Sequence, residues 1–266
     1  MATENNWLRS NLSERLLNNS TDFVVHLETK PYKVMSFDDA ANYTADIIAT
    51  KSSKVFIGFS GGMDSEFVFR RMIDRGHNVI PVIVSTPINK YESAYAFRVC
   101  KQYGIEPIVI DKTPTELLTI FVDDIFKKLS GYGHNSVPGL IVGRYAEDHG
   151  GIMIMSEHII DDNDGKMYVG ANEWDFYNDV LIHNDNTHYF FTYTPELCCA
   201  MVKEMADETV QDFKSRVYNI PWRPKFSYDY GSAYDLAFVR IRQHRLHTPD
   251  PNHNFGTKEQ FLSLFD

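Results

Sequence analysis

Lys54-Val-Phe-Ile-Gly-Phe-Ser-Gly-Gly-Met-Asp-Ser65 is the stretch that decides the fold. It begins as an apolar run over residues 55–59 that is rich in strand-forming residues. Two glycines interrupt the run, and Val68 and Met72 beyond them stand four residues apart, the spacing of one helical face. The stretch therefore predicts a buried strand, a glycine turn and a helix.

The glycine turn has the features of an anion-binding loop. Gly61 and Gly62 let the backbone approach a ligand closely, and the first N–H groups and the dipole of the next helix favour phosphate. Ser60 and Ser65 add hydroxyl groups. Asp64 suits such a site if its carboxylate holds Mg²⁺, which would bridge it to phosphates. A plain strand-to-helix turn, capped by Ser or Asp, is the alternative.

The six residues Ser60-Gly-Gly-Met-Asp-Ser65 resemble the SGGxDS signature of the PP-loop ATP pyrophosphatase superfamily at every position. The resemblance implies an enzyme that splits ATP into AMP and pyrophosphate and adenylates a substrate, with Mg²⁺ as its metal. It implies ATP contacts at Ser60, Gly61, Gly62, Met63, Asp64 and Ser65. The Gly-Lys-Ser/Thr ending of the ordinary P-loop is absent from the turn.

Strands and helices alternate beyond the turn. Strands are expected at residues 55–59, 79–84, 106–110 and 152–155, and helices at residues 66–73, 89–103, 114–129 and 140–149. This order predicts an α/β fold, a doubly wound parallel sheet of about five strands, with a helical C-terminal portion. Ligands of such sheets bind at the carboxyl ends of the strands, where the glycine turn lies.

Three parts are expected: an N-terminal layer (1–50), an ATP-binding α/β domain (51–190) and a C-terminal helical lid (191–266). The layer is predicted to hold an amphipathic helix at 5–18, a strand at 21–28 and a helix from Ser36, opened by a Ser-x-x-Asp cap. The lid shows helical patterns at 192–217 and 230–247. Asp161-Asp-Asn-Asp-Gly165 predicts a hairpin turn.

Further site residues follow from the resemblance. The second strand of the superfamily's sheet meets adenine through its backbone, which implies contacts at Ile83 and Val84; a simple core role is the alternative. A helix and a strand ending in Ser156-Glu157 are similar to one place in asparagine synthetases. Ser156 is then an ATP contact, and Glu157 a catalytic residue that holds Mg²⁺ or the incoming amine. A surface carboxylate is the alternative, and Asp161 comes one position late for the family's spacing.

Lys225, in Trp222-Arg-Pro-Lys-Phe226, is the third catalytic candidate beside Asp64 and Glu157. Late lysines close over the phosphates in several superfamily members. A cation is useful there because the transition state and the leaving pyrophosphate are strongly negative. A solvated loop lysine is the alternative reading.

Composition restricts the partners. The net charge of −10 argues against a broad nucleic-acid-binding face. Three cysteines, Cys100, Cys198 and Cys199, form no CxxC pair, so a reducing, cytoplasmic compartment is expected. The N-terminus lacks a signal-peptide pattern, and no window reaches the ~18 apolar residues of a membrane span.

The asparagine-synthetase-like branch implies an ATP-dependent ligase. AMP is placed on a carboxylate or carbonyl oxygen of a small-molecule or macromolecular acceptor, and ammonia or an amine then displaces it. Ala2 stands where the family's N-terminal glutaminase carries its nucleophilic Cys, and residues 1–50 are too few for that domain. Ammonia or an external amine is therefore expected as the nucleophile, and a homo-oligomer stays open.

Other members of the superfamily remain alternatives. Thiolation of tRNA or a base generally needs a sulfur-carrying Cys and a basic surface. A sulfonucleotide reductase is disfavoured because no Cys follows Cys199, and a deazapurine synthase because three cysteines cannot supply its four-Cys zinc site. An NAD synthetase stays open although its Gly-Thr-x-Asn signature is not visible. A non-catalytic nucleotide-binding subunit is the third class, against which the intact Asp64 argues.

Overall fold

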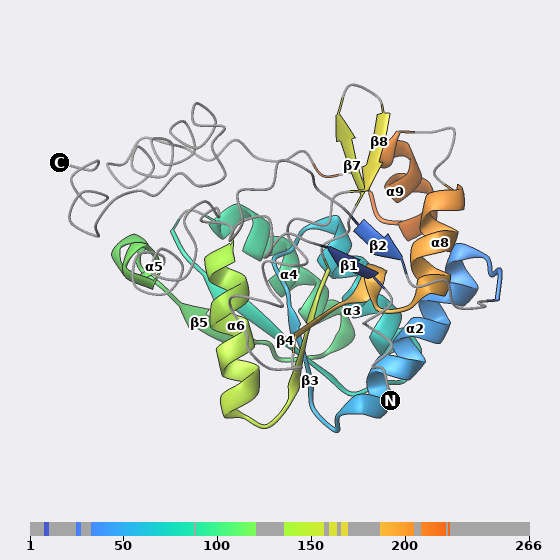
Figure 1. Ribbon diagram of the computed structural model, residues 1–266. Coiled ribbons are helices and arrows are strands. Elements are labelled where there is room, and N and C mark those ends of the chain that lie inside the picture. Colours follow the sequence, from blue (N-terminus) through green and yellow to red (C-terminus); the bar gives the residue numbers. More distant parts are fainter. Residues whose placement is uncertain are drawn as a thin grey trace.

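The computed structural model describes residues 8–10, 25–27, 33–87, 89–120, 136–156, 160–163, 166–169, 187–204, 209–221 and 223. A five-stranded parallel sheet with the strand order β5-β4-β3-β6-β9 lies at its centre (Figure 1). Its strands are β3 (Val55–Gly58), β4 (Val79–Ser85), β5 (Ile108–Asp111), β6 (Ile152–Met155) and β9 (Thr187–Tyr189). The expected α/β class and parallel sheet are confirmed.

The central strands are apolar because both of their faces are covered. Val55, Phe56 and Ile57 of β3 are all buried, and an uninterrupted apolar run is typical of a parallel strand between two helical layers. Val55 pairs in register with Val79 of β4 on one side and with Ile152 of β6 on the other. The apolar run before the glycine turn is thus the middle strand of the sheet.

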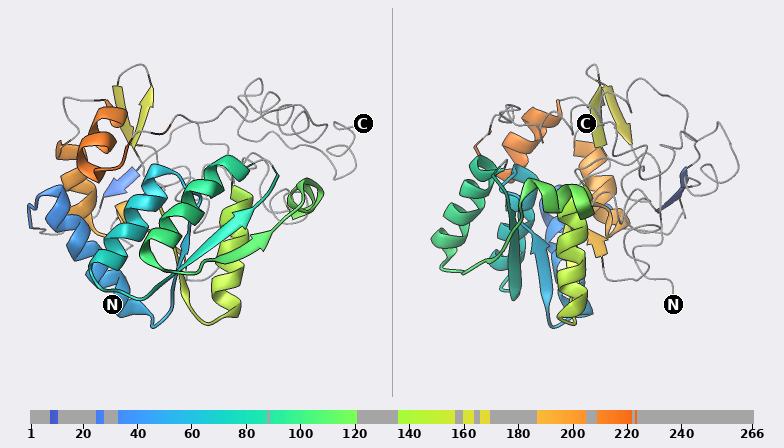
Figure 2. Two further views of the ribbon diagram at one scale, coloured as in Figure 1. Left: turned by 180° about the vertical axis from the view of Figure 1, so that it is seen from behind. Right: turned by 90° about the vertical axis from the view of Figure 1, so that its left-hand side faces the viewer.

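Helices cover both faces of the sheet. From β3 the chain moves outward through α3 (Met63–Asp74), β4 and α4 (Lys90–Tyr103) to the edge strand β5 and α5 (Pro114–Ile120). It returns through α6 (Ser136–Asp148) to β6, on the other side of β3. Right-handed crossovers in opposite directions place their helices on opposite faces, and Figure 2 shows the strands between α4 and α6.

The order of the strands reverses between β3 and β6. Strands β4 and β5, which come next in the chain, lie on one side of β3. The later strands β6 and β9 lie on its other side. Crossovers on either side of such a reversal diverge, which leaves a crevice beyond the carboxyl ends of the two adjacent strands. The glycine turn at residues 60–65 lies at the carboxyl end of β3, next to this reversal of strand order.

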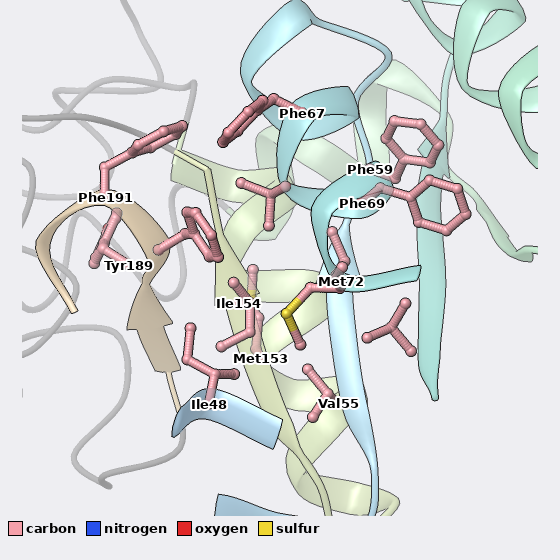
Figure 3. Close-up of a cluster of buried hydrophobic side chains, with 14 of the residues drawn as sticks. Ile48, Val55, Phe59, Phe67, Phe69, Met72, Met153, Ile154, Tyr189 and Phe191 are labelled. Carbon is pink, nitrogen blue, oxygen red and sulfur yellow. The ribbon is translucent and has the colours of Figure 1, made fainter. Parts of the chain in front are cut away.

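Helices that precede and follow the βα units share the core of the sheet. Helix α2 (Phe37–Lys51) begins at the predicted cap, where Ser36 Oγ accepts from Asp39 N–H at 3.2 Å. It packs against α3 and against α8 (Pro195–Glu204), which follows the short 3₁₀ helix η4 (Phe190–Thr192). Figure 3 shows Ile48 of α2, Met72 of α3, Ile154 of β6 and Phe191 of η4 in one buried cluster.

Aromatic rings join α2 to α9 (Val210–Tyr218). The ring of Phe37 lies 5.5 Å from that of Phe67 on α3 and 5.4 Å from that of Phe213 on α9. Tyr218 stacks on Phe67 with 4.3 Å between ring centroids. All four rings are buried. Helix α9 is therefore fixed to the helix that starts at the glycine turn.

Several expectations from the sequence need correction. Leu8–Ser10 form the strand β1, which pairs antiparallel with β2 (Val25–Leu27), so the helix expected at 5–18 is wrong there and a strand within 21–28 is confirmed. Pairing with a partner strand overrides the helical spacing of the leucines. Helix α6 begins at Ser136 rather than at residue 140, since Pro138 and Gly139 lie in its first turn, where proline is tolerated.

The C-terminal third differs in two further respects. The helix expected over 192–217 is divided into η4, α8 and α9. The three residues of β9 were not expected, because Thr-His-Tyr is too short to show a strand pattern.

The predicted hairpin is confirmed by the antiparallel strands β7 (Ile160–Asn163) and β8 (Lys166–Val169). Residues 121–129 and 230–247, expected to be helical, lie outside the described residues.

The length and hydropathy of the helices were compared with what a membrane span requires. None of the helices that the structure describes combines the length and the apolar character needed to cross a membrane.

Candidate functional site

Two serine hydroxyls close the glycine turn. Ser60 Oγ and Ser65 Oγ lie 3.1 Å apart, Gly62 N–H donates to Ser60 Oγ at 3.2 Å, and Ser65 Oγ donates to the Gly62 carbonyl at 3.0 Å. Gly62 is the N-cap residue of α3. The first N–H groups of a helix have no acceptor within the helix. The turn thus brings a pair of hydroxyls next to the positive end of a helix.

Gly61 has a conformation and a position that only glycine fits. Its φ is +91°, and a Cβ atom at this position would lie 2.0 Å from the backbone oxygen of Glu92 on α4. Gly62 differs, since its φ is −69° and a Cβ there would meet Ser60 Oγ at 3.4 Å, an ordinary contact. The first glycine is therefore required by the fold, whereas the second leaves room for a small side chain.

The turn and the end of β6 lie at the same edge of the sheet. The Phe59 N–H still donates to the Val82 carbonyl at 2.9 Å, so the chain leaves the sheet only at Ser60. Ser156 directly follows β6, which pairs with β3, and it is half-buried. The structure therefore brings residues 60–65 and Ser156 to the carboxyl edge of the adjacent strands β3 and β6, where the order of the strands reverses.

Asp64 is held by two residues of α9. Lys214 Nζ donates to Asp64 Oδ2 at 2.7 Å, and the Tyr218 hydroxyl donates to Asp64 Oδ1 at 2.9 Å. Burial raises the pKa of Tyr218 well above its usual value, and the adjacent Asp64 carboxylate raises it further. Tyr218 consequently remains a neutral hydrogen-bond donor throughout the physiological pH range.

A second group of charges lies beside the turn. Glu66 is fully buried, and its carboxylate pairs with Arg70 at 2.5 Å and with Arg223. Arg223 Nη1 also donates to the Gly61 carbonyl at 2.6 Å. The Arg223 guanidinium lies over the ring of Tyr95, 4.3 Å from its centroid. The polar contacts of Arg223 thus reach both the glycine turn and the first turn of α3.

Several cations lie beside the turn. Among the described residues that hold the turn, two carboxylates, Asp64 and Glu66, face three cations, Lys214, Arg70 and Arg223. The whole chain is acidic, with a net charge of −10, whereas these three cations gather beside the turn. A local positive potential at a helix N-terminus favours a polyanionic ligand.

Ile83 and Val84 lie in the expected strand, β4, with their side chains in the core. Both side chains are buried, and β4 is paired on both sides, with β3 and β5. The Val84 carbonyl accepts from Asn89 Nδ2 at 2.8 Å. Asn89 Oδ1 also accepts from Thr86 N–H at 2.8 Å, which closes a turn at the end of β4. The core role of both residues is confirmed, and their contact with adenine stays a prediction.

Other expected site residues are not placed. Glu157 and Lys225 lie outside the described residues, and Asp161 is described only as part of the backbone of β7. Within the part of the chain that the structure describes, no group of three or more His, Cys, Asp and Glu side chains is arranged to hold a metal ion. The metal roles of Asp64 and Glu157 and the catalytic role of Lys225 therefore stay predictions.

Three residues of the site were not anticipated from the sequence. Lys214 and Tyr218 stand four apart on α9, so their common face was open to prediction from helical spacing. Their contact with Asp64 was not, because it joins positions 150 and 154 residues apart in the chain. Arg223 lies in the basic cluster that drew attention to Lys225, but nothing local indicates that the arginine reaches Gly61.

Comparison with known proteins gives likenesses of fold alone. No family model and no curated protein sequence matches the chain. Among solved structures, the NMN synthetase of Francisella tularensis is 14% identical and matches over 80% of this chain and 95% of its own, with a TM-score of 0.39. The NH3-dependent NAD synthetase of Campylobacter jejuni is 17% identical, over 86% and 95%, with a TM-score of 0.40.

A third similar structure is the U34-tRNA thiolase of Methanococcus maripaludis, solved with its [4Fe-4S] cluster. It is 12% identical over 84% of this chain and 89% of its own, with a TM-score of 0.40. At these identities and scores the likenesses assign neither a family nor an activity. The case for a function therefore rests on the residues of the turn and on their geometry.

Proposed function

We propose that this chain is an ATP pyrophosphatase of the PP-loop type that binds ATP at residues 60–65. It cleaves ATP between the α- and β-phosphates and transfers AMP to a carboxylate or carbonyl oxygen. One observation carries the proposal: the complete Ser60-Gly-Gly-Met-Asp-Ser65 signature opens a helix at the carboxyl end of the central strand, beside the reversal of strand order. A structural turn alone would not require this combination.

The turn supplies the donors that a polyphosphate needs. The hydroxyls of Ser60 and Ser65 lie together at the N-terminus of α3, where N–H groups and the helix dipole stabilise negative charge. Ser65 is buried, and its hydroxyl is held in place because it donates to the Gly62 carbonyl. In this proposal the turn holds the β- and γ-phosphates, which leave together as pyrophosphate.

Asp64 is the residue that would hold Mg²⁺. The ion is generally bound by one or two carboxylates together with substrate phosphates and water, so a single carboxylate in the turn fits this mode. Mg²⁺, when bound, would stabilise the negative charge that develops on the leaving pyrophosphate. In the structure the Asp64 oxygens accept from Lys214 and Tyr218, so metal binding would require the carboxylate to exchange at least one of these donors.

Lys214 is the cation best placed to act on the phosphates. Its ammonium lies 2.7 Å from a carboxylate of the turn, and its side chain is only 12% exposed. If the Asp64 carboxylate held Mg²⁺, Lys214 would lose this partner, and its ammonium would be available to phosphates bound at the turn. A poorly hydrated cation in that position stabilises the departing charge more strongly than one in water. Lys214 thereby takes the function that the sequence analysis expected of Lys225.

The second half of the proposed reaction is amide or amine formation, in which ammonia or an amine attacks the adenylated acceptor. The state of the cysteines favours this over sulfur transfer. Burial raises the pKa of Cys100 to about 11 and that of Cys198 to about 12. A buried thiol with a raised pKa forms little thiolate and reacts poorly, so neither thiol is suited to carry sulfur. Cys199 is half-buried.

Positional isotope exchange tests the proposed adenylation before the amine is known. ATP carrying ¹⁸O in the bridge between its α- and β-phosphates is incubated with Mg²⁺ and a panel of carboxylic acids. Reversible adenylation would scramble the label into non-bridging positions of the β-phosphate only with a suitable acceptor. The D64N variant serves as the control for contaminating activity. Failure of every acid and carbonyl compound to cause exchange, with ATP bound, would contradict the ligase chemistry.

A further inference from the structure

We propose that Arg223 is a positioning residue that fixes the orientation of the Gly61–Gly62 peptide and so keeps a carbonyl oxygen out of the anion site. The inference rests on the proposed binding of ATP at residues 60–65. It concerns a residue outside the signature, on the segment that follows α9.

The two ends of this peptide have different partners on opposite sides. The Gly61 carbonyl accepts from Arg223 Nη1 at 2.6 Å, and the Gly62 N–H donates to Ser60 Oγ at 3.2 Å. In a trans peptide the C=O and the N–H point in opposite directions. Arg223 therefore holds the oxygen on the side away from the Ser60 and Ser65 hydroxyl pair.

Glycine on both sides makes this peptide easy to rotate. A flip of the plane changes ψ of Gly61 and φ of Gly62, and neither residue has a Cβ atom to oppose the change. Rotation would carry φ of Gly62 from its present −69° toward positive values. It would also turn the Gly61 oxygen toward the hydroxyl pair, where its partial negative charge would repel a phosphate. A loop that binds anions thus needs a group that holds this oxygen.

Arg223 is itself held in place by two further contacts. Its Nη2 pairs with the carboxylate of Glu66, which is fully buried on the first turn of α3. Its guanidinium lies over the ring of Tyr95, 4.3 Å from the centroid. A planar guanidinium can donate to two acceptors at once and stack on a ring, whereas an ammonium has no such geometry. Lysine should therefore not replace this arginine.

Substitution of Gly62 distinguishes control of the peptide orientation by Arg223 from a purely structural role of Arg223. The observed φ of −69° accepts alanine, but the flipped peptide, with φ of residue 62 positive, does not. In the wild-type background we expect R223Q and R223K to weaken ATP binding by about tenfold or more, the scale of a hydrogen bond to a charged group. In a G62A background the same changes should cost less than about threefold, because alanine itself opposes the flip.

Calorimetry with ATP and with adenosine would measure these affinities for the full chain. R216Q is the matched control, since it removes one cation from α9 whose contacts include Glu204 and Phe213. We expect adenosine affinity to be the same in R223Q, R223K and R216Q, because only the phosphates meet the peptide. Equal losses of ATP affinity in the Gly62 and G62A backgrounds would overturn the inference, as would equal losses for ATP and adenosine.

Relaxation dispersion of backbone ¹⁵N nuclei tests the peptide without nucleotide. We expect R223Q to produce microsecond-to-millisecond exchange at Gly61 and Gly62, while Gly76 and Gly104, which lie in other turns, stay unchanged. A flat dispersion profile and unchanged resonances at Gly62 in R223Q would refute the positioning role, whatever the effect of R223Q on ATP affinity. Exchange at Gly62 in a protein whose wild-type form does not bind ATP would keep the positioning role and reject the proposed function.

Discussion

Lys214 Nζ lies 2.7 Å from Asp64 Oδ2, and this contact joins a helix near the end of the described chain to the only carboxylate of the glycine turn. The pair is mostly sheltered, with the side chains 12% and 27% exposed. Tyr218, one turn further along α9, donates to the other Asp64 oxygen. Helix α9 is therefore part of the candidate site and more than a cover over it.

Replacing Lys214 by Met should slow turnover more than it weakens ATP binding. The ammonium acts on charge that develops only as the bond between the α- and β-phosphates breaks. Removal of one such stabilising group generally costs about 10²–10³-fold in turnover. Steady-state rates of ATP cleavage and calorimetric affinities would separate the two effects.

Lys203, which is exposed at the end of α8, provides the control for loss of one positive charge. K203M should have wild-type kinetics. Turnover of K214M within about threefold of the wild type would show that the ammonium takes no part in the chemistry.

Gly61 and Gly62 should respond differently to alanine. At Gly61 a Cβ atom would lie 2.0 Å from the Glu92 backbone oxygen and φ is +91°, so G61A must displace α4 or the turn. We expect G61A to lose ATP binding and to unfold at lower urea concentration. G62A should unfold at the same concentration as the wild type, because φ of Gly62 is −69°. Urea denaturation followed by circular dichroism measures both, and equal midpoints for wild type and G61A would contradict the packing at Gly61.

Activity should not depend on thiols. Thiolate forms as pH rises through the pKa, so thiols with pKa values of about 11 and 12 remain protonated at pH 8. Iodoacetamide at pH 8 should therefore leave Cys100 and Cys198 unmodified in the folded protein, as mass spectrometry of peptides would show. A C100A/C198A/C199A variant that folds should retain turnover. Loss of turnover with ATP binding retained would favour sulfur transfer over the ligase reaction.

Phe37 should be important for stability although it lies far from the turn in sequence. Its ring is 1% exposed and packs against Phe67 and Phe213, which joins α2, α3 and α9. We expect F37A to lower the free energy of unfolding by about 3–5 kcal/mol, the usual cost of truncating a buried Phe. Exposed Tyr43 on the same helix is the control site. A loss below about 1 kcal/mol for F37A would contradict a core shared by these helices.

The central βα units were predictable because their signals are local. Residues 55–59 show an unbroken apolar run, Ser36 a cap, and Gly104 a helix stop with φ of +65° in the structure. These patterns depend on neighbours a few residues away, and strand alternation with helices then determines the parallel sheet. The position of the turn at the carboxyl edge followed from the topology alone.

Contacts between segments that are distant in the chain could not be predicted from the sequence. Leucines at 8, 12 and 16 have helical spacing, yet Leu8 pairs with Leu27 in a two-stranded sheet. Asp64 was interpreted as a metal ligand because its local setting is a phosphate loop. Its hydrogen bonds to Lys214 and Tyr218 come from tertiary packing, which no short-range pattern encodes. Strand β9 is too short for its period to be detected.

Identification of the nucleotide product tests most directly whether the protein cleaves ATP to AMP and pyrophosphate. Wild-type protein and D64N would be incubated with ATP, Mg²⁺ and an acceptor identified by isotope exchange, and the products separated by anion-exchange chromatography. We expect AMP and pyrophosphate in equal amounts from the wild type only when acceptor is present, and about 10²–10³-fold slower formation by D64N. ADP and phosphate as products, or wild-type rates for D64N, would contradict the proposed chemistry at the glycine turn.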